Sequence, residues 1–430
     1  MLGPRRSSGK SKSRTPTART LAASTLLAVL EDGAYANAHL GAAMGRDRLK
    51  DPRDRALATE LVYGVLRWQR RLDRCLTPHL REGGLEPIAW VLLRLGAYQI
   101  LRLDRIPDPV AVSATQEAAR QLGYGRLTGL LNAVLRKVVR FREPPFEGGV
   151  AQQLATRTSV PDWLVPLAQE AFGDDAEEEL FALRDRAGTS VRPTLKRGGA
   201  DAVKSALEDD GFEVSDGLHG TLMIQGPGDP FDTEAFRQGL FVPQDPASLA
   251  VVDAMNLAQG HRVLDLCAGR GVKSTAILDR GATVLAIDPV SEKLDQAVDL
   301  ARRLHLEDGL EIRAMDGTST TDLGTFDRVL IDAPCSGLGT LRRHPEIAWR
   351  IRPGDRGSVR DLQQRLLAAG SRHVAPGGLL IYAVCTFAVD EGDPGTPEGF
   401  SPHGDPALTR PSEGVDSFWI RAWRRDGQEG

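Results

Sequence analysis

The stretch HRVLDLCAGRGVKSTAILDRGATVLAID, residues 261–288, decides the fold of the C-terminal part of the chain. It contains a short apolar run typical of a buried strand, a turn with two glycines, a helical segment and a second apolar run. The alternation continues toward the C-terminus, with further apolar runs in FDRVLIDA at 326–333 and GGLLIYAVC at 377–385. This pattern predicts an α/β domain over residues 241–426, in which helices cover both faces of a parallel sheet.

The N-terminal part has a different pattern. Apolar residues recur every three or four positions in segments between 18 and 143, separated by Gly, Pro and Asp, so we expect an all-helical bundle there. A linker should follow at 143–149. Residues 150–240 mix helical and strand patterns and should form a small α+β connecting subdomain. Residues 1–17 are almost free of apolar side chains and should be a disordered basic tail.

Composition narrows the class of protein. The 430 residues are 41% hydrophobic, which is enough for two or three domains with their own cores. Only four cysteines are present, the N-terminus does not resemble a signal peptide, and Arg94 interrupts the longest apolar run. We therefore expect a protein of the reducing cytoplasm, with neither a disulfide framework nor a membrane span.

Charge is distributed unevenly along the chain. Residues 1–145 carry 25 Lys and Arg against 13 Asp and Glu, a net charge of +12, whereas the remainder carries 29 against 45, a net charge of −16. A basic N-terminal part fits electrostatic attachment to a nucleic-acid backbone. A solvated, Arg-rich helical surface would give the same count, so charge alone does not identify the partner.

Three acids stand at the ends of successive predicted strands, which is where open α/β sheets bind ligands. Asp265 precedes the turn with Gly269 and Gly271, Asp288 follows 23 residues later, and Asp316 ends the third strand. The spacing suits hydrogen bonds from a ribose and an adenine amino group, although any one acid could be a helix cap. The turn lacks the GxxxxGK[ST] pattern and a complete GxGxxG pattern. These acids therefore point to S-adenosylmethionine rather than to a nucleoside triphosphate or NAD.

Two cysteines also follow predicted buried strands: Cys335 in DAPC at 332–335, and Cys385 in YAVC at 382–385. With a methyl donor bound, such thiols suit methyl transfer to carbon 5 of a pyrimidine, because a thiolate that adds to carbon 6 makes carbon 5 nucleophilic. Asp332 is placed to bind the ring at N3 and the exocyclic amine. One cysteine alone would more simply be an inert core thiol, but two of them, one in DAPC, favour chemistry.

These motifs resemble those of a known family. VLDLCAGRGVKS at 263–274, DAPCSGLGTLRRHPEIAW at 332–349 and YAVCTF at 382–387 resemble the cofactor, substrate and nucleophile motifs of the RNA cytosine-5 methyltransferases of the RsmB/Sun/Nop2 type. LLRLGAYQILRLDRIPD and LLNAVLRKVVR resemble the NusB-like RNA-binding domain of the 16S ribosomal RNA members. The resemblance spans residues 18–425. It implies a NusB-like helical bundle, the α+β connecting subdomain, and a Rossmann-like class I methyltransferase domain.

The resemblance also implies roles for single residues. Cys385 would be the nucleophile, Cys335 would assist release of the methylated product, and Asp332 would hold a cytosine that has left its stack. The residues expected around S-adenosylmethionine are Asp265, Cys267, Ala268, Gly269, Gly271, Lys273, Asp288, Asp316 and Asp332. Lys273 and Pro334 would contact the substrate. Arg342 and Arg343 would contact RNA phosphates, or else lie in a solvated loop. No metal ion is expected.

The chain departs from the family pattern at several positions. Arg270 and Val272 replace the usual Pro and Gly, Thr386 replaces Ser, DEGD at 390–393 replaces Glu-Glu-Asn, and SVRPTLKR lacks the usual Arg-x-Asn ending. These departures keep an alternative open, a non-catalytic RNA-binding or ribosome-assembly factor with a drifted methyltransferase domain.

The retained thiols and acid favour an enzyme over that alternative. A DNA methyltransferase with Cys335 as nucleophile would leave Cys385 without a task. We therefore predict a monomeric RNA cytosine-5 methyltransferase that acts on 16S ribosomal RNA or an assembling small subunit. The target nucleotide does not follow from the sequence.

Overall fold

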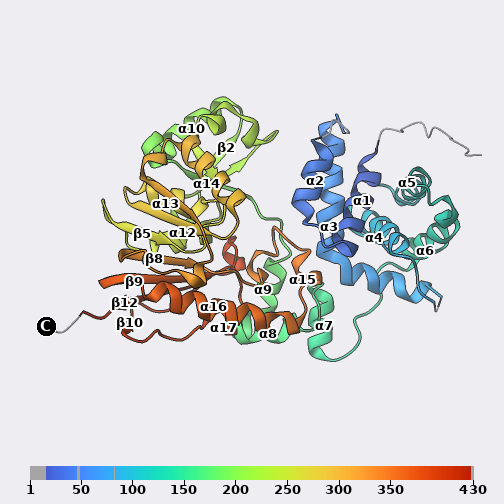
Figure 1. The fold of residues 1–430 in the computed structure, drawn as a ribbon. Coiled ribbons are helices and arrows are strands. Elements are labelled where there is room, and N and C mark those ends of the chain that lie inside the picture. Colours follow the sequence, from blue (N-terminus) through green and yellow to red (C-terminus); the bar gives the residue numbers. More distant parts are fainter. Residues whose placement is uncertain (1–15, 46–48, 82, 428–430) are drawn as a thin grey trace, which may run out of the picture. The chain divides into compact units, whose positions relative to one another are not determined.

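The structure is a computed structural model that describes residues 16–45, 49–81 and 83–427 (Figure 1). Almost all of the predicted tail at 1–17 lies outside the described residues. The chain divides into two compact units. The first comprises the residues up to Asp162 together with His344–Arg350, and the second comprises Trp163–Arg343 and the residues from Ile351 onward.

The first unit is all-helical, as predicted. Its helices are α1 (Ala18–Glu31), α2 (Ala36–Met44), α3 (Pro52–Leu76), α4 (Pro87–Arg102), α5 (Asp108–Gln121), α6 (Thr128–Phe141), α7 (Val150–Arg157) and α15 (Ile347–Arg350). Asp51 starts α3 by accepting a hydrogen bond from the Arg53 backbone N–H. The sequence pattern does not predict α2, because this helix buries only Ala36 and Leu40 and has no apolar stripe.

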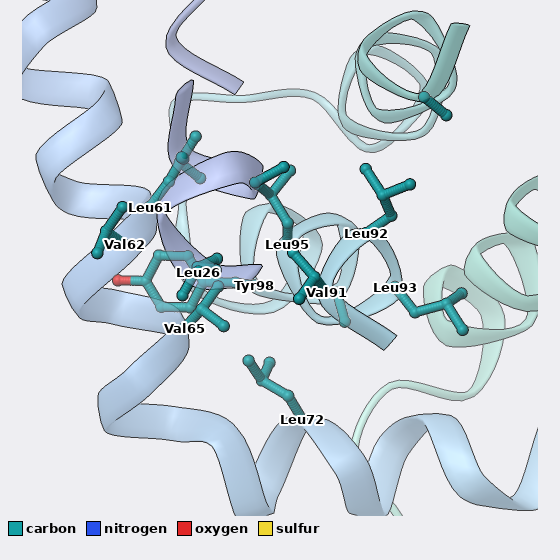
Figure 2. Packing of buried hydrophobic residues seen from close by; sticks show 14 of the residues in the cluster. Leu26, Leu61, Val62, Val65, Leu72, Val91, Leu92, Leu93, Leu95 and Tyr98 are labelled. Atoms are coloured by element: carbon teal, nitrogen blue, oxygen red, sulfur yellow. The ribbon is translucent and has the colours of Figure 1, made fainter. Parts of the chain in front are cut away.

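Apolar side chains of α1, α3 and α4 form the centre of this unit (Figure 2). Figure 2 labels Leu26, Leu61, Val62, Val65, Leu72, Val91, Leu92, Leu93, Leu95 and Tyr98. Gly64 permits the close approach of α3 to α4, since a Cβ there would lie 2.0 Å from Cζ of Tyr98. The buried Tyr98 hydroxyl donates to Glu60 at 2.5 Å. These side chains form one apolar core of closely packed residues within the helical unit.

The second unit begins with helices and a small antiparallel sheet of strand order β2-β3-β1-β4. Its elements are α8 (Leu164–Phe172), α9 (Ala176–Ala182), β1 (Thr189–Pro193), α10 (Gly199–Asp209), β2 (Glu213–Asp216), β3 (Leu222–Gln225), α11 (Glu234–Arg237) and β4 (Phe241–Pro243). The structure contains the helices and strands predicted here and adds α9, α11 and β2. This strand escaped prediction because EVSD is short and almost wholly polar.

The larger sheet has the strand order β10-β12-β9-β8-β5-β6-β7, with β11 paired to β12. Five neighbouring strands are parallel: β5 (Arg262–Asp265), β6 (Thr283–Asp288), β7 (Leu310–Ala314), β8 (Phe326–Asp332) and β9 (Val374–Val384). β10 (Phe400–Pro402), β11 (Ala407–Leu408) and β12 (Trp419–Arg425) pair antiparallel. The prediction of a parallel sheet therefore holds for these five strands but not for this edge. Parallel pairing of β12 would need a crossover, and the described stretch between β9 and β12 contains a single α-helix, the four-residue α17 (Val389–Gly392).

Helices cover both faces of the larger sheet, as predicted. They are α12 (Pro246–Asp253), α13 (Val272–Asp279), α14 (Ser291–Leu304) and α16 (Arg356–Ser371). Successive strand residues enter different cores: Leu330 packs in the cluster that includes Ile277 of α13, whereas Val329 packs in the cluster that includes Leu366 of α16. The described part of the chain contains no helix long and apolar enough to cross a membrane.

Candidate active site

The predicted site residues gather at the carboxyl ends of adjacent strands. β5 lies beside β8, and β8 lies beside β9. Asp265 and Asp332 are the last residues of β5 and β8, and Cys385 directly follows β9. Polar and nucleophilic side chains from three strands therefore meet at one edge of the sheet, where ligands of open α/β sheets bind.

The two cysteines are in direct contact. The Sγ atoms of Cys335 and Cys385 lie 3.0 Å apart, although fifty positions separate them in the sequence. Both side chains are half-buried. The hydrogen bond between the thiols, together with burial, raises the pKa of Cys335. The fold thus brings both predicted thiols within reach of one small substrate group.

Backbone contacts hold the loops that carry these cysteines. The Gly339 N–H donates to the Cys385 carbonyl at 3.0 Å, and the Ser417 N–H donates to the Gly339 carbonyl at 2.9 Å. A Cβ at Gly339 would lie 1.9 Å from the Ser417 carbonyl oxygen. The close approach of three backbone segments therefore requires glycine at position 339.

Lys273 and Asp332 form an ion pair beside the thiols. Nζ of Lys273 lies 2.5 Å from Oδ2 of Asp332 and 5.1 Å from the ring centre of Phe418. Burial alone would lower the pKa of Lys273. The carboxylate of Asp332, with smaller effects from Cys385 and Asp265, outweighs burial and raises this pKa. Lys273 is therefore an ammonium that fixes the orientation of the Asp332 side chain.

Asp265 is a buried carboxyl group with one oxygen free for a ligand. Its Oδ2 accepts a hydrogen bond from the Ser274 hydroxyl at 2.6 Å, whereas Oδ1 is buried and has no partner among the described residues. Burial, with a smaller effect of the Asp332 charge, raises the pKa of Asp265 to about 6. A buried acceptor without a partner at a strand end suits a hydrogen-bond donor on a bound ligand.

The turn after β5 leaves open space at Gly269. Gly269 and Gly271 have φ angles of 53° and 75°, and a Cβ at Gly269 would meet no atom within 4 Å. The positive φ angles occur only at the two glycines of this turn, so Arg270 and Val272 need no left-handed backbone conformation. Arg270 is exposed and Val272 is the first residue of α13. The two departures therefore leave the glycine turn intact.

Asp288 ties this turn to the next strand. It is buried at the end of β6, and its carboxylate accepts hydrogen bonds from the Gly269 N–H at 3.1 Å and the Val290 N–H at 2.9 Å. Cys267 and Ala268 are half-buried within the turn, and burial raises the pKa of Cys267. The turn is thus held on both sides. The open space and the free oxygen of Asp265 fit an adenosyl ligand.

The remaining predicted site residues have local partners. Asp316 is exposed and accepts hydrogen bonds from the Thr318 N–H and hydroxyl, each at 2.8 Å, which lowers its pKa. This is the helix-cap geometry considered above, and contact with adenine stays a prediction. Pro334 is exposed next to Cys335.

Arg342 and Arg343 lie within the second unit. Arg342 is 6% exposed. Arg343 pairs with Asp245 at 2.7 Å and with Asp416 at 3.2 Å, and its side chain is 31% exposed. Contacts of these arginines with phosphate stay predictions.

The structure adds residues that the motifs did not assign. Thr386 is buried, and its hydroxyl oxygen accepts hydrogen bonds from the Ser336 hydroxyl at 3.0 Å and the Ala388 N–H at 3.1 Å. Serine has the same hydroxyl, so this departure preserves the contacts. Phe418 beside Lys273 and the buried Glu391 were also missed. The only sign of Glu391 in the sequence was that DEGD contains a glutamate where the family pattern has Glu-Glu-Asn.

No metal centre accompanies these groups. Across residues 16–45, 49–81 and 83–427, no three His, Cys, Asp or Glu side chains come together in a way that could hold a metal ion.

Comparisons with known proteins match both parts of the chain. Residues 252–408 match the family model of the 16S rRNA methyltransferase RsmB/F, and residues 16–140 match the NusB family. The ribosomal RNA small subunit methyltransferase B of Thermus thermophilus is 36% identical over 384 residues, which cover 88% of this chain and 86% of that protein. A probable enzyme of the same name from Bacillus subtilis is 31% identical and covers 87% and 86%.

Solved structures show the same fold. The crystal structure of PH0851 has a TM-score of 0.80 at 21% identity and covers 96% of this chain and 100% of its own. NSun6 from Pyrococcus horikoshii, solved with SFG, has a TM-score of 0.55 at 15% identity, with coverage of 62% and 98%. At these identities the likeness concerns the fold alone. The curated relatives, in contrast, exceed 30% identity over most of both chains. The chain therefore belongs to the RsmB/F family of ribosomal RNA methyltransferases, which use S-adenosylmethionine.

Proposed function

We propose that this enzyme methylates carbon 5 of a cytosine in 16S ribosomal RNA through a covalent bond to Cys385. The observation that carries the proposal is the 3.0 Å contact between the sulfur atoms of Cys335 and Cys385. Carbons 5 and 6 of a pyrimidine are bonded to each other, so two groups that act on them must lie close together. Two thiols in contact, next to the Lys273–Asp332 ion pair, meet that requirement.

Each residue has one task in this scheme. The Cys385 thiolate adds to carbon 6, and the electrons of the 5,6 double bond make carbon 5 nucleophilic. Asp332 accepts a hydrogen bond from the exocyclic amine and, once addition at carbon 6 has led to protonation of N3, a second one from the N3–H, while Lys273 keeps the carboxylate in place. Bound S-adenosylmethionine supplies an electrophilic methyl group. Carbon 5 would take this methyl group, with S-adenosylhomocysteine as the leaving group. The carbon 5 proton then passes to a base at Cys335, the electrons of the carbon 5–hydrogen bond restore the double bond, and Cys385 leaves carbon 6 as a thiolate.

The methyl donor would be held by the strand ends described above. The free Oδ1 of Asp265 and the open turn at Gly269 support its amino-acid end, and Asp288 and Asp316 support its ribose and adenine. Asp265 and Asp288 end β5 and β6, and Asp316 lies two residues beyond β7, so a methyl donor bound along these acids would lie near Lys273 at the start of α13, just after the turn that follows β5.

The helical unit would supply affinity for RNA. Arg136, Lys137 and Arg140 are exposed along α6, and the whole N-terminal part carries the net positive charge noted above. Cationic side chains of this kind bind phosphates without reading sequence. RNA binding by this unit should therefore weaken steeply with added salt.

The alternative of a non-catalytic assembly factor has less support. The reason to consider this alternative was that Arg270, Val272 and Thr386 depart from the family pattern. With Arg270 and Val272 present the glycine turn is intact, and Thr386 provides the hydroxyl that accepts from Ser336. The thiols and Asp332 remain together.

A pair of substitutions tests the proposal. Cys335→Ser protein, incubated with S-adenosylmethionine and 16S ribosomal RNA, should accumulate a covalent protein–RNA adduct that resists denaturing electrophoresis, because release is blocked. Cys385→Ser should abolish the adduct and the methylation. Absence of an adduct from both Cys335→Ser and wild-type protein, together with no heat of S-adenosylmethionine binding, would support the assembly-factor alternative. Bisulfite mapping of 16S ribosomal RNA from a deletion strain identifies the cytosine.

A further inference from the structure

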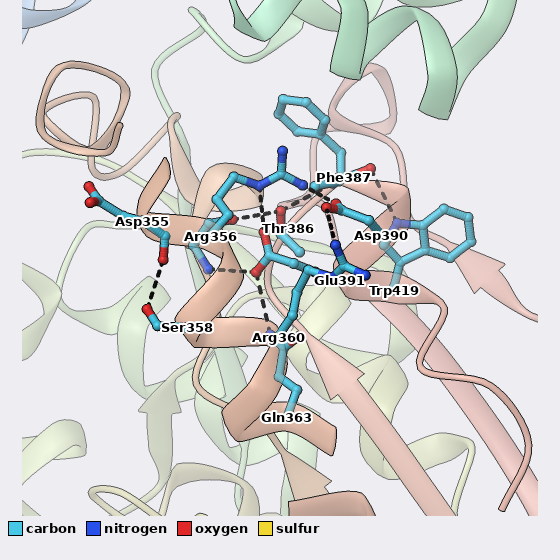
Figure 3. Close-up of polar contacts among 12 residues, drawn as sticks. Asp355, Arg356, Ser358, Arg360, Gln363, Thr386, Phe387, Asp390, Glu391 and Trp419 are labelled. Carbon is cyan, nitrogen blue, oxygen red and sulfur yellow. Dashed lines mark hydrogen bonds and ion pairs between the residues drawn. The ribbon is translucent and has the colours of Figure 1, made fainter. Parts of the chain in front are cut away.

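A buried carboxylate lies behind the two cysteines. Glu391 in α17 is fully buried. One of its oxygens accepts a hydrogen bond from the Ser336 backbone N–H at 2.8 Å and lies 3.4 Å from Nε2 of Gln363. Its other oxygen faces Nε of Arg356 at 3.4 Å. Figure 3 shows Arg356 and Gln363 of α16 approaching Glu391. A buried charge with this many partners is held in one geometry.

These contacts hold the backbone both before and after Cys335. Ser336 follows Cys335 and bonds Glu391 directly. Pro334 precedes Cys335, and its carbonyl accepts a hydrogen bond from Gln363 at 2.9 Å. The same Gln363 amide group contacts Glu391. The backbone on either side of the thiol is therefore tied to one carboxylate.

The same network reaches the loop of Cys385. The Ser336 hydroxyl donates to the hydroxyl of Thr386, the residue that follows Cys385, at 3.0 Å. The Tyr382 hydroxyl, on the strand that leads to Cys385, donates to the Glu391 backbone carbonyl at 2.8 Å. Glu391 thus connects the loops that carry the two thiols without touching either sulfur.

We propose that Glu391 is a positioning residue that sets Cys335 against Cys385. The inference rests on the proposed function, because a fixed distance between the sulfurs matters only if both act on one base. In enzymes, a displacement of about 1 Å in a reacting group can lower the rate about 100-fold. Release should suffer most, because Glu391 holds the Cys335 loop directly and the Cys385 loop through Ser336 and Thr386.

The neighbouring Asp390 offers a matched control. It pairs with the same Arg356 and lies 3.6 Å from Arg360, but its side chain is 34% exposed. None of its hydrogen bonds or ion pairs among the described residues reaches either cysteine loop. Asp390→Asn therefore removes one carboxylate from Arg356, as Glu391→Gln does, and leaves the loops in place.

Steady-state and adduct measurements test the proposal. Glu391→Gln keeps the side-chain shape but replaces one oxygen with an amino group, which has no acceptor where Arg356 and Gln363 donate. We expect kcat to fall about 10- to 100-fold, with the KM for RNA nearly unchanged and with accumulation of the Cys385 adduct. Asp390→Asn should retain nearly full kcat. In a Cys335→Ser background Glu391→Gln should not slow adduct breakdown further, and a multiplicative effect there would overturn the proposal.

A second measurement does not depend on the reaction. The thiol oxidant diamide can join Cys335 and Cys385 in a disulfide, since the two thiols lose two electrons and two protons that reduce the N=N bond of diamide to a hydrazine. Wild type and Asp390→Asn should cross-link at equal rates, and Glu391→Gln at least several-fold more slowly. Equal rates in all three proteins would overturn the positioning role even if the enzyme is active.

Two further outcomes separate the proposals. If Glu391→Gln slows cross-linking but no RNA adduct forms with any variant, the proposed function fails while Glu391 still orients the thiols. If Glu391→Gln does not fold, Gln363→Leu replaces it, because this change removes only the amide that contacts the Pro334 carbonyl and Glu391. Gln363→Leu should also slow diamide cross-linking, and an unchanged rate would count against the network.

Discussion

Asp265→Asn should stabilise the second unit above pH 6. Burial raises the pKa of Asp265 to about 6 from the ordinary value of 3.8. Between these values the folded protein binds the proton and the unfolded chain does not, so stability falls as the pH rises. One pKa unit corresponds to about 1.4 kcal/mol, so the full cost of the buried charge is about 3 kcal/mol at pH 8. Asparagine has nearly the same shape, can still accept from Ser274, and has no charge to bury.

Calorimetry of the cofactor-free protein measures this effect. For a unit of this size a gain of about 3 kcal/mol corresponds to a rise in Tm of roughly 6 to 12 °C at pH 8. Near pH 4.5 the gain should fall to about 1 kcal/mol, because Asp265 is then protonated in the fold. Asp316→Asn is the control, since that exposed carboxylate has a lowered pKa and its replacement should bring no gain. A Tm of Asp265→Asn that is unchanged or lower at pH 8, or a gain that does not vary with pH, would refute the reasoning.

Two further substitutions probe the loops around the thiols. Gly339→Ala should destabilise the second unit by about 1 to 3 kcal/mol or more, because the added Cβ meets the Ser417 carbonyl oxygen at 1.9 Å. Urea unfolding measures the loss of stability, and a variant as stable as wild type would contradict this contact. Thr386→Ser should leave the methylation rate unchanged. Thr386→Val should lower that rate and slow diamide cross-linking of Cys335 to Cys385, because valine has no oxygen to accept from the Ser336 hydroxyl. Equal methylation and cross-linking rates for both variants would show that the hydroxyl is dispensable.

The sequence predicted the layers of the fold well because its periodicities are strong. The helical unit and the alternation of strands and helices follow directly from apolar spacing. The antiparallel edge did not, since the direction of β12 depends on the connection after β9 rather than on the pattern within either strand. Likewise α2 was missed because few of its side chains are buried.

Among the site residues, sequence reasoning performed best where a motif and a strand end coincide. Asp265, Asp332 and Cys385 end adjacent strands, and topology alone brings such positions together. Phe418 escaped prediction because it reaches Lys273 from the loop that precedes the antiparallel β12, and nothing in the local sequence marks that approach.

The case of Glu391 shows how a motif comparison can mislead. DEGD in place of Glu-Glu-Asn is one of the departures that leave a non-catalytic alternative open, yet its glutamate is fully buried and its neighbour Asp390 lies partly in solvent. A carboxylate is costly to bury unless several donors surround it, and here the Ser336 N–H, Gln363 and Arg356 do so. Those donors come from the loop after β8 and from α16, so no spacing within the motif could reveal them. Departures from a motif therefore need to be weighed by what each side chain contacts, and at this site Glu391 and Thr386 still make the hydrogen bonds that join the loops of the two thiols.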